Sequence, residues 1–128
     1  MSEQRIGCAI FGAGWVAGEH INAYLANPNA ELVAVGSRRE ASARAAAEKA
    51  GLDDVAIYTD LDELLSDDRV QALSVTTPNH VHVEQGVKAC KAGKHFIMEK
   101  PVAIDQDSLK ELRDAVRESG VKTVVSFC

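Results

Sequence analysis

The chain has 128 residues, 46% of them hydrophobic and 26% charged, which suits one compact domain with its own core and excludes a disordered segment. Acidic residues outnumber basic ones by 19 to 14, for a formal net charge of −5, and the basic residues are scattered, so we expect no nucleic-acid partner. The polar start of the chain and the lack of an apolar run of about 20 residues predict a cytoplasmic protein that does not enter a membrane.

Three cysteines, Cys8, Cys90 and Cys128, occur without any Cys-x-x-Cys spacing. An odd set that lacks this spacing predicts neither a disulfide framework nor a zinc site. Cys8 lies in an apolar run and Cys90 in a predicted helix, so both are expected to be buried as small hydrophobic side chains.

The predicted elements begin with a strand, a glycine turn and a helix. Residues 5–11 suit a buried strand, Gly12-Ala13-Gly14 predicts a tight turn, and Asn27-Pro28-Asn29 ends the helix that follows. Later apolar runs predict strands, and Ala-rich or periodic stretches predict helices. The expected strands cover 5–11, 31–36, 56–58, 70–75, 94–98 and 122–127. The expected helices cover 15–26, 40–50, a short segment after Asp60 with Leu61, Leu64 and Leu65, 81–92 and 108–119.

Six strands that alternate with five helices through short connections predict an α/β fold. Such alternation favours a Rossmann-type, doubly wound parallel sheet with helices on both faces, formed by residues 1–128 as one domain. Glycines just past three of the helices, Gly51, Gly93 and Gly120, suit helix ends. Ligands of this fold bind outside the carboxyl ends of the strands, so the loops after the first, fourth and fifth strands are the expected site.

The glycine turn after the first strand predicts dinucleotide binding. Gly12 allows the tight turn, Gly14 removes a side chain that would block a pyrophosphate, and Ala17 is the third small residue of a GxGxxA pattern. Free backbone N–H groups at the helix start then face the phosphates. The residues predicted to bind cofactor here are Gly12, Ala13, Gly14, Trp15 and Val16.

The end of the second strand decides between NAD and NADP. An NAD-specific domain usually has Asp or Glu there, whereas this chain has Gly36-Ser37-Arg38-Arg39. Ser37 and Arg38 suit the 2′-phosphate of NADP(H), which arginine can pair with bidentately, so NADP is favoured. NAD stays open, because an arginine here can also stack on adenine alone.

Two histidines, His80 and His82, are separated by one residue after the predicted fourth strand. This His-x-His spacing is the only pattern that suggests a metal. No nearby cysteine or carboxylate completes a ligand set, so we predict no metal site. His20 and His95 are expected to be structural or surface residues.

Three blocks in one order resemble the Gfo/Idh/MocA family, the group of glucose-fructose oxidoreductase and inositol dehydrogenase. These are the glycine turn, Thr77-Pro78-Asn79-His80-Val81-His82, and the segment 92–101, which reads AGKHFIMEKP. The resemblance runs over essentially all 128 residues. It implies that Lys100 matches the catalytic lysine beside the nicotinamide, that Glu99 matches a residue that bonds the nicotinamide ribose, and that further residues line the middle and nicotinamide end of the cofactor. These further residues are Thr77, Pro78, Asn79 and His82.

The resemblance also implies a second α/β domain after the sixth strand, which this chain does not contain. That domain would carry the pocket for a small hydroxyl substrate and would largely set any homo-oligomeric state. We therefore expect an NAD(P)-dependent oxidoreductase acting on a sugar, polyol or similar compound, with the 128 residues alone binding cofactor but inactive. A stand-alone dinucleotide sensor, a subunit of a split enzyme, and a binder of nucleotide sugars or S-adenosylmethionine remain alternatives.

Overall fold

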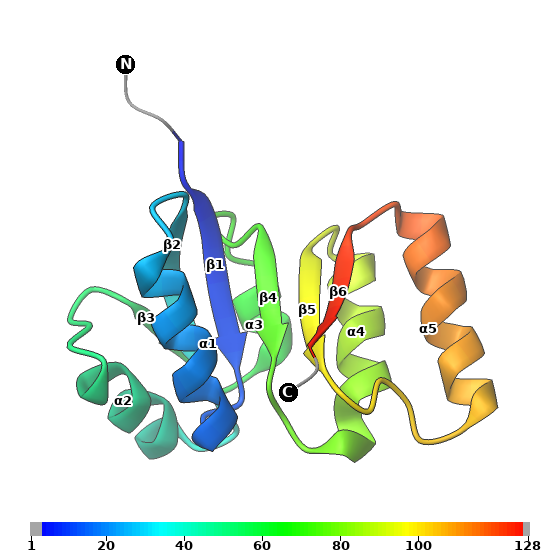
Figure 1. Ribbon diagram of the computed structural model, residues 1–128, viewed down its shortest axis with the longest axis horizontal. Helices are drawn as coiled ribbons and strands as arrows, with labels where there is room; N and C mark the ends of the chain where they lie inside the picture. The colour runs from blue at the N-terminus through cyan, green and yellow to red at the C-terminus, as the bar shows by residue number, and fades with distance from the viewer. Residues whose placement is uncertain (1–3, 127–128) are drawn as a thin grey trace.

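The computed structural model describes residues 4–126, which fold as one parallel sheet with helices on both faces (Figure 1). The strand order is β3-β2-β1-β4-β5-β6, and every neighbouring pair is parallel. The order reverses between β1 and β4, so their carboxyl ends flank the crevice where ligands of this fold bind. The strands are β1 (Ile6–Phe11), β2 (Ala30–Gly36), β3 (Ala56–Tyr58), β4 (Ala72–Val75), β5 (His95–Glu99) and β6 (Thr123–Ser126). The helices are α1 (Trp15–Ala26), α2 (Glu40–Lys49), α3 (Leu61–Leu65), η1 (Asn79–Val81), α4 (His82–Lys91) and α5 (Gln106–Ser119).

Alternate residues of β1 contribute to two separate cores. Ala9 and Phe11 of β1 point into the larger core, which α3, α4 and α5 cover. Ile10 points into a smaller core with Ala17 and Ile21 of α1. This alternation follows from the two-residue period of a strand and places the side chains of β4 and β5 on predictable faces.

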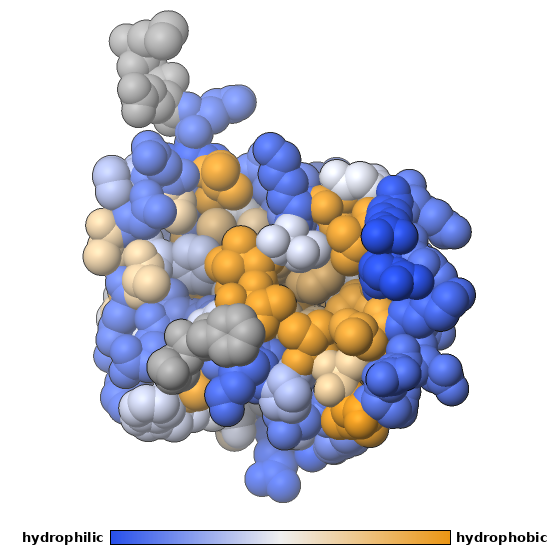
Figure 2. All heavy atoms as spheres, turned by 45° about the vertical axis from the view of Figure 1, so that its right-hand side comes forward, coloured by the Kyte–Doolittle hydropathy of each residue, from blue (hydrophilic) through white to orange (hydrophobic). Residues whose placement is uncertain are grey.

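The face on the α1 side is only partly covered. α1 and α2 pack over β1, β2 and β3, while Val124 of β6 is 58% exposed. Figure 2, which brings the β6 side forward, shows apolar side chains gathered on this part of the surface. A second hollow therefore lies beside α1, over β5 and β6.

The expected fold, its six strands and the five expected helices are confirmed, with small shifts at the ends. β4 begins at Ala72 rather than at residue 70, because the N–H of Val70 donates to Asp67 O in a turn instead of to the sheet. α5 begins two residues earlier than expected, because Asp105 caps it by accepting a hydrogen bond from the N–H of Ser108 at 2.7 Å. The predicted end of the last strand at Phe127, and Cys128, lie outside the described residues.

The three helix-ending glycines and the two other cysteines match their predictions. Gly51, Gly93 and Gly120 all have φ between 72° and 74°, the left-handed conformation that ends a helix. Cys8 and Cys90 are buried free thiols. No helix in the described part of the chain has both the length and the apolar character that a membrane crossing requires.

Candidate cofactor site

The loops that leave β1, β2 and β4 surround a cavity of about 600 Å³ at the carboxyl edge of the sheet. This volume suits a small-molecule site. Most of the predicted cofactor residues line it, including the whole glycine turn. The lining residues are Phe11, Gly12, Ala13, Gly14, Trp15, Val16, Ser37, Arg38, Arg39, Ser42, Thr76, Thr77, Pro78, His80, Val81 and Gln85.

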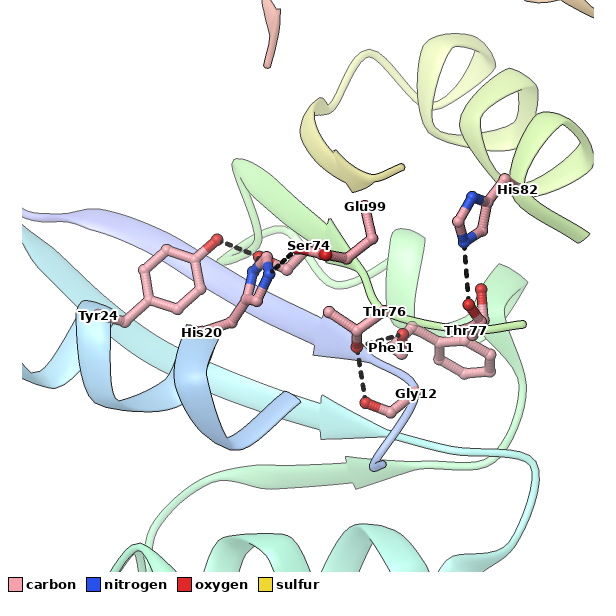
Figure 3. A network of polar contacts seen from close by, with 9 residues as sticks. All are labelled: Phe11, Gly12, His20, Tyr24, Ser74, Thr76, Thr77, His82 and Glu99. Carbon is pink, nitrogen blue, oxygen red and sulfur yellow. Dashed lines mark hydrogen bonds and ion pairs between the residues drawn. The ribbon is translucent and has the colours of Figure 1, made fainter. Parts of the chain in front are cut away.

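Gly12 is required where the glycine turn meets the loop after β4. Its φ is 107°, and a Cβ at this position would lie only 2.5 Å from the carbonyl oxygen of Thr76. The hydroxyl of Thr76 in turn donates to Gly12 O at 2.8 Å, as Figure 3 shows. The two loops are thus held together by a contact that only glycine permits.

Gly14 has a different environment, because a Cβ there would meet no protein atom within 4 Å. Its φ of −78° suits any residue, so neither the backbone nor the packing of the fold requires glycine here. An open approach to the backbone is what a pyrophosphate needs, and Gly14 leaves the amide groups of the first α1 turn accessible.

The N-terminus of α1 differs from those of α3 and α5. Asp60 and Asp105 cap those two helices through their carboxylates. The N-cap residue of α1 is Gly14, which has no side chain to accept a hydrogen bond from the first turn. That turn also carries no acidic residue. Its N–H groups and the positive end of the helix dipole therefore remain available to an anionic ligand.

The end of β2 brings positive charge to the same cavity. Arg38 and Arg39 are exposed and line it, together with Ser37 and with Ser42, which sequence reasoning did not single out. Ser42 lies in the first turn of α2, three residues after Arg39, and that helical spacing was the available signal. The nearby acid, Glu40, pairs with Arg44 at 2.8 Å, which leaves the arginines at the cavity without an acidic neighbour in its lining.

The loop after β4 is held from behind by His82. This side chain is fully buried, with Nδ1 at 2.7 Å from Pro101 O and Nε2 at 2.9 Å from Thr77 O. His82 thus joins the exit loops of β4 and β5, and it lies behind the cavity rather than in its lining. Thr77 and Pro78 do line the cavity, whereas Asn79 is exposed outside the lining.

Glu99 lies at the end of β5, on the α1 face of the sheet. Its Oε2 is 2.8 Å from Nε2 of His20, a helix residue expected only to be structural or at the surface. Burial raises the pKa of Glu99, but hydrogen bonds from His20 and Ser126 together bring it below its usual value. Glu99 is therefore ionised near neutral pH. Lys100, the next residue, is exposed and lies outside the lining of the 600 Å³ cavity.

A second cavity, of about 620 Å³, continues from the first along α1. The two share Trp15 and Val16, so the first turn of α1 connects the glycine turn with Glu99. Most of the predicted cofactor residues thus line the first cavity and Glu99 lines the second, whereas Asn79, His82 and Lys100 line neither. Among the described residues, no group of three or more His, Cys, Asp and Glu side chains is placed to hold a metal ion.

The chain is similar to known oxidoreductases. The model of the family described as an oxidoreductase family with an NAD-binding Rossmann fold, Gfo/Idh/MocA, matches residues 6–127. D-glucoside 3-dehydrogenase from Escherichia coli K12 is 35% identical over 99% of this chain and 36% of its own length. The scyllo-inositol 2-dehydrogenase (NAD(+)) of Bacillus subtilis is 30% identical over 98% of this chain and 36% of its own length.

Solved structures agree with these relatives. GenD2 from gentamicin A biosynthesis, determined in complex with NAD, superposes with a TM-score of 0.88 and 29% identity. The match covers 98% of this chain and 35% of GenD2. The chain thus spans about a third of the length of the curated relatives that it matches.

Proposed function

Since the chain belongs to the Gfo/Idh/MocA family of oxidoreductases with an NAD-binding Rossmann fold, we propose that it holds the cofactor of an enzyme acting on a sugar, polyol or similar hydroxyl compound. When bound, the nicotinamide supplies the hydride acceptor or donor. The residues of this chain bind and orient it, and a second domain supplies the substrate pocket. The threefold greater length of the relatives supports such a domain.

One observation carries the proposal: an uncapped helix N-terminus opens into a cavity beside a glycine that the fold itself does not require. Gly14 lies at that point, with no protein atom within 4 Å of where its Cβ would be. The amides of Trp15 and Val16 then serve the pyrophosphate, and Thr77 and Pro78 form the opposite wall. Residues present in this chain therefore fit a dinucleotide.

Beside the nicotinamide end, we assign Glu99 to the nicotinamide ribose and Lys100 to the reacting hydroxyl. The ionised carboxylate of Glu99 is suited to accept hydrogen bonds from ribose hydroxyls. The Nζ of Lys100 would hold or release the proton of the substrate hydroxyl, and it is the one catalytic residue that we propose within this chain.

We also propose that NADP(H) is preferred over NAD(H). Ser37, Arg38 and Arg39 line the cavity at the end of β2, and Ser42 adds a second hydroxyl. A guanidinium binds a phosphate through two parallel hydrogen bonds, whereas an unphosphorylated ribose offers only neutral hydroxyls. Two relatives are described with NAD, so the preference of this chain is tested by measuring its affinity for both nucleotides.

Gly14→Val tests the cofactor site. Its side chain would project into the open cavity, so affinity for NADPH and NADH should fall at least about tenfold, as fluorescence titration would measure. The free energy of unfolding should fall by only about 1 kcal/mol, because the added Cβ meets no protein atom and the cost is that of valine in place of glycine at the N-cap of α1.

Gly18→Val is the matched control. Gly18 is an exposed residue of α1 at which an added Cβ would likewise meet no atom within 4 Å, yet it lies outside both cavities. This variant should bind as the wild type does. Equal affinity of Gly14→Val and wild type would contradict the proposed site.

A further inference from the structure

A chain of four polar side chains runs beneath the second cavity, between α1 and the sheet (Figure 3). Tyr24 OH lies 2.6 Å from Ser74 Oγ, Ser74 Oγ lies 2.9 Å from His20 Nδ1, and His20 Nε2 lies 2.8 Å from Glu99 Oε2. Ser74 is fully buried, and the side chains of His20 and Glu99 are only 11% and 13% exposed. Burying a hydroxyl without a hydrogen-bond partner is costly, so the four side chains are expected to share their protons in one ordered hydrogen-bond network.

The sequence places these groups together through two periodicities. His20 and Tyr24 are four residues apart on α1 and therefore share one face of the helix. Ser74 alternates with the buried residues Leu73 and Val75, which face the other core, and so it points toward α1. Glu99 alternates in the same way with Met98.

One arrangement of donors satisfies all three contacts when the His20 ring carries a single proton. The ionised carboxylate of Glu99 can only accept, so His20 Nε2 carries a hydrogen and donates it. With one proton on the ring, Nδ1 accepts from the hydroxyl of Ser74, and Ser74 Oγ then accepts from Tyr24. Burial raises the pKa of Tyr24 to about 12, so this hydroxyl keeps the proton that it donates.

We propose that His20 is a positioning residue that holds Glu99 at the nicotinamide ribose, with Ser74 and Tyr24 fixing its Nε2–H tautomer. The proposal rests on the proposed function, because it needs a cofactor for Glu99 to meet. His20 takes one lone pair of Oε2 and Ser126 takes a second lone pair of the carboxylate, which leaves about two of its four for a ribose hydroxyl. Trp15 and Val16 line both cavities, so a dinucleotide anchored at the glycine turn can extend along α1 toward Glu99.

Two isosteric amide variants test the hydrogen bond from His20 Nε2. In His20→Gln the side-chain amide can still donate from the place of Nε2, whereas in His20→Asn the amide reaches only the place of Nδ1. His20→Asn should therefore weaken NADH binding about tenfold, the effect of losing a hydrogen bond to a charged group. His20→Gln should recover most of that loss. A packing role would also favour the larger glutamine, so the ADP affinity and the imidazole tautomer decide between the two roles.

The pair of probes NADH and ADP localises the effect. Both lack the 2′-phosphate, and ADP also lacks the nicotinamide ribose, so His20→Asn should weaken NADH but leave ADP unchanged. Asn22→Ala, an exposed substitution on the same helix outside both cavities, should change neither affinity. Adding His20→Asn to Glu99→Gln should cause little further loss, because His20 acts on the ribose only through Glu99.

Nitrogen-15 NMR of the wild-type imidazole provides a readout that is independent of binding. We expect Nε2 to be protonated and Nδ1 to be unprotonated, and we expect Ser74→Ala to weaken this preference, because only Glu99 then sets it. A protonated Nδ1, equal affinities of both isosteric variants, or a parallel loss of ADP binding would each overturn the role of His20. If the wild type bound neither NADH nor NADPH, the proposed function itself would fail, and this proposal with it.

Discussion

Arg38 distinguishes this chain from a domain that binds the adenosine ribose through an acid. It is exposed at the end of β2, and its guanidinium would pair with a 2′-phosphate in partly solvated surroundings. We expect Arg38→Ala to lower NADPH affinity about tenfold while NADH affinity changes less than about twofold. Titration of both nucleotides at fixed salt measures this difference.

Lys49→Ala serves as the control for charge alone. Lys49 is an exposed cation in the last turn of α2 and lies outside the cavity. Removing it should leave the ratio of the two affinities unchanged. Tighter binding of NADH than of NADPH by the wild type would reverse the preference that we propose.

At the scale of elements, Asp67 joins the end of α3 to β3. The hydroxyl of Tyr58 donates to its Oδ2 at 2.8 Å, and the guanidinium of Arg69 binds both of its oxygens. The hydrogen bond from Arg69 is the main reason that the pKa of Asp67 lies well below its usual value. A carboxyl with a lowered pKa in the folded state stabilises the fold above its unfolded pKa, and loses this contribution as the pH falls.

Asp67→Asn should therefore reduce the free energy of unfolding by about 1–2 kcal/mol at neutral pH, with part of the ion-pair energy screened because Arg69 is exposed. The difference from wild type should shrink below about pH 4, where the unfolded wild type becomes protonated. Urea unfolding across this range measures it. Asp68→Asn, at the exposed neighbour, should show no such pH dependence, and a constant difference for Asp67→Asn would refute the linkage.

The elements themselves were largely predictable, because hydrophobic period and helix-end residues are local signals. The bounds of α1 and β3 agree with those expected from the apolar run, the glycine turn and the proline that follows α1. The shifts have local causes that periodicity does not register. Asp105 starts α5 early through a cap, and after Pro78 a 3-10 turn precedes α4 at His82.

Side-chain networks were less predictable, since they depend on which strands become neighbours. The role of His82 in joining two loops requires Thr77 and Pro101 to be close, although 24 positions separate them along the chain. His20 was expected to be structural or exposed. A serine inside the apolar run of β4 was the signal for a buried partner, but its partner emerges only once α1 lies over β4.

At the scale of the whole molecule, binding and turnover are separable. Both cavities lie within this chain, whereas the relatives are about three times as long. Orientation of a substrate against the nicotinamide can supply about 7–11 kcal/mol of barrier lowering, and we place that task in the second domain. The 128 residues should therefore bind NADPH without measurable reduction of NADP⁺ by sugars or polyols, as cofactor absorbance would report.

Lys100→Ala tests whether cofactor binding and turnover are separable. Lys100 is exposed and lies outside the cavity lining, so its removal should leave the cofactor affinity of the 128 residues within about twofold of wild type. In a protein that also carries the second domain, the same change should lower kcat far more than it raises the Kd for cofactor, because the ammonium acts on the reacting hydroxyl. An unchanged kcat would remove Lys100 from the chemistry, and turnover by the 128 residues alone would remove the need for a second domain.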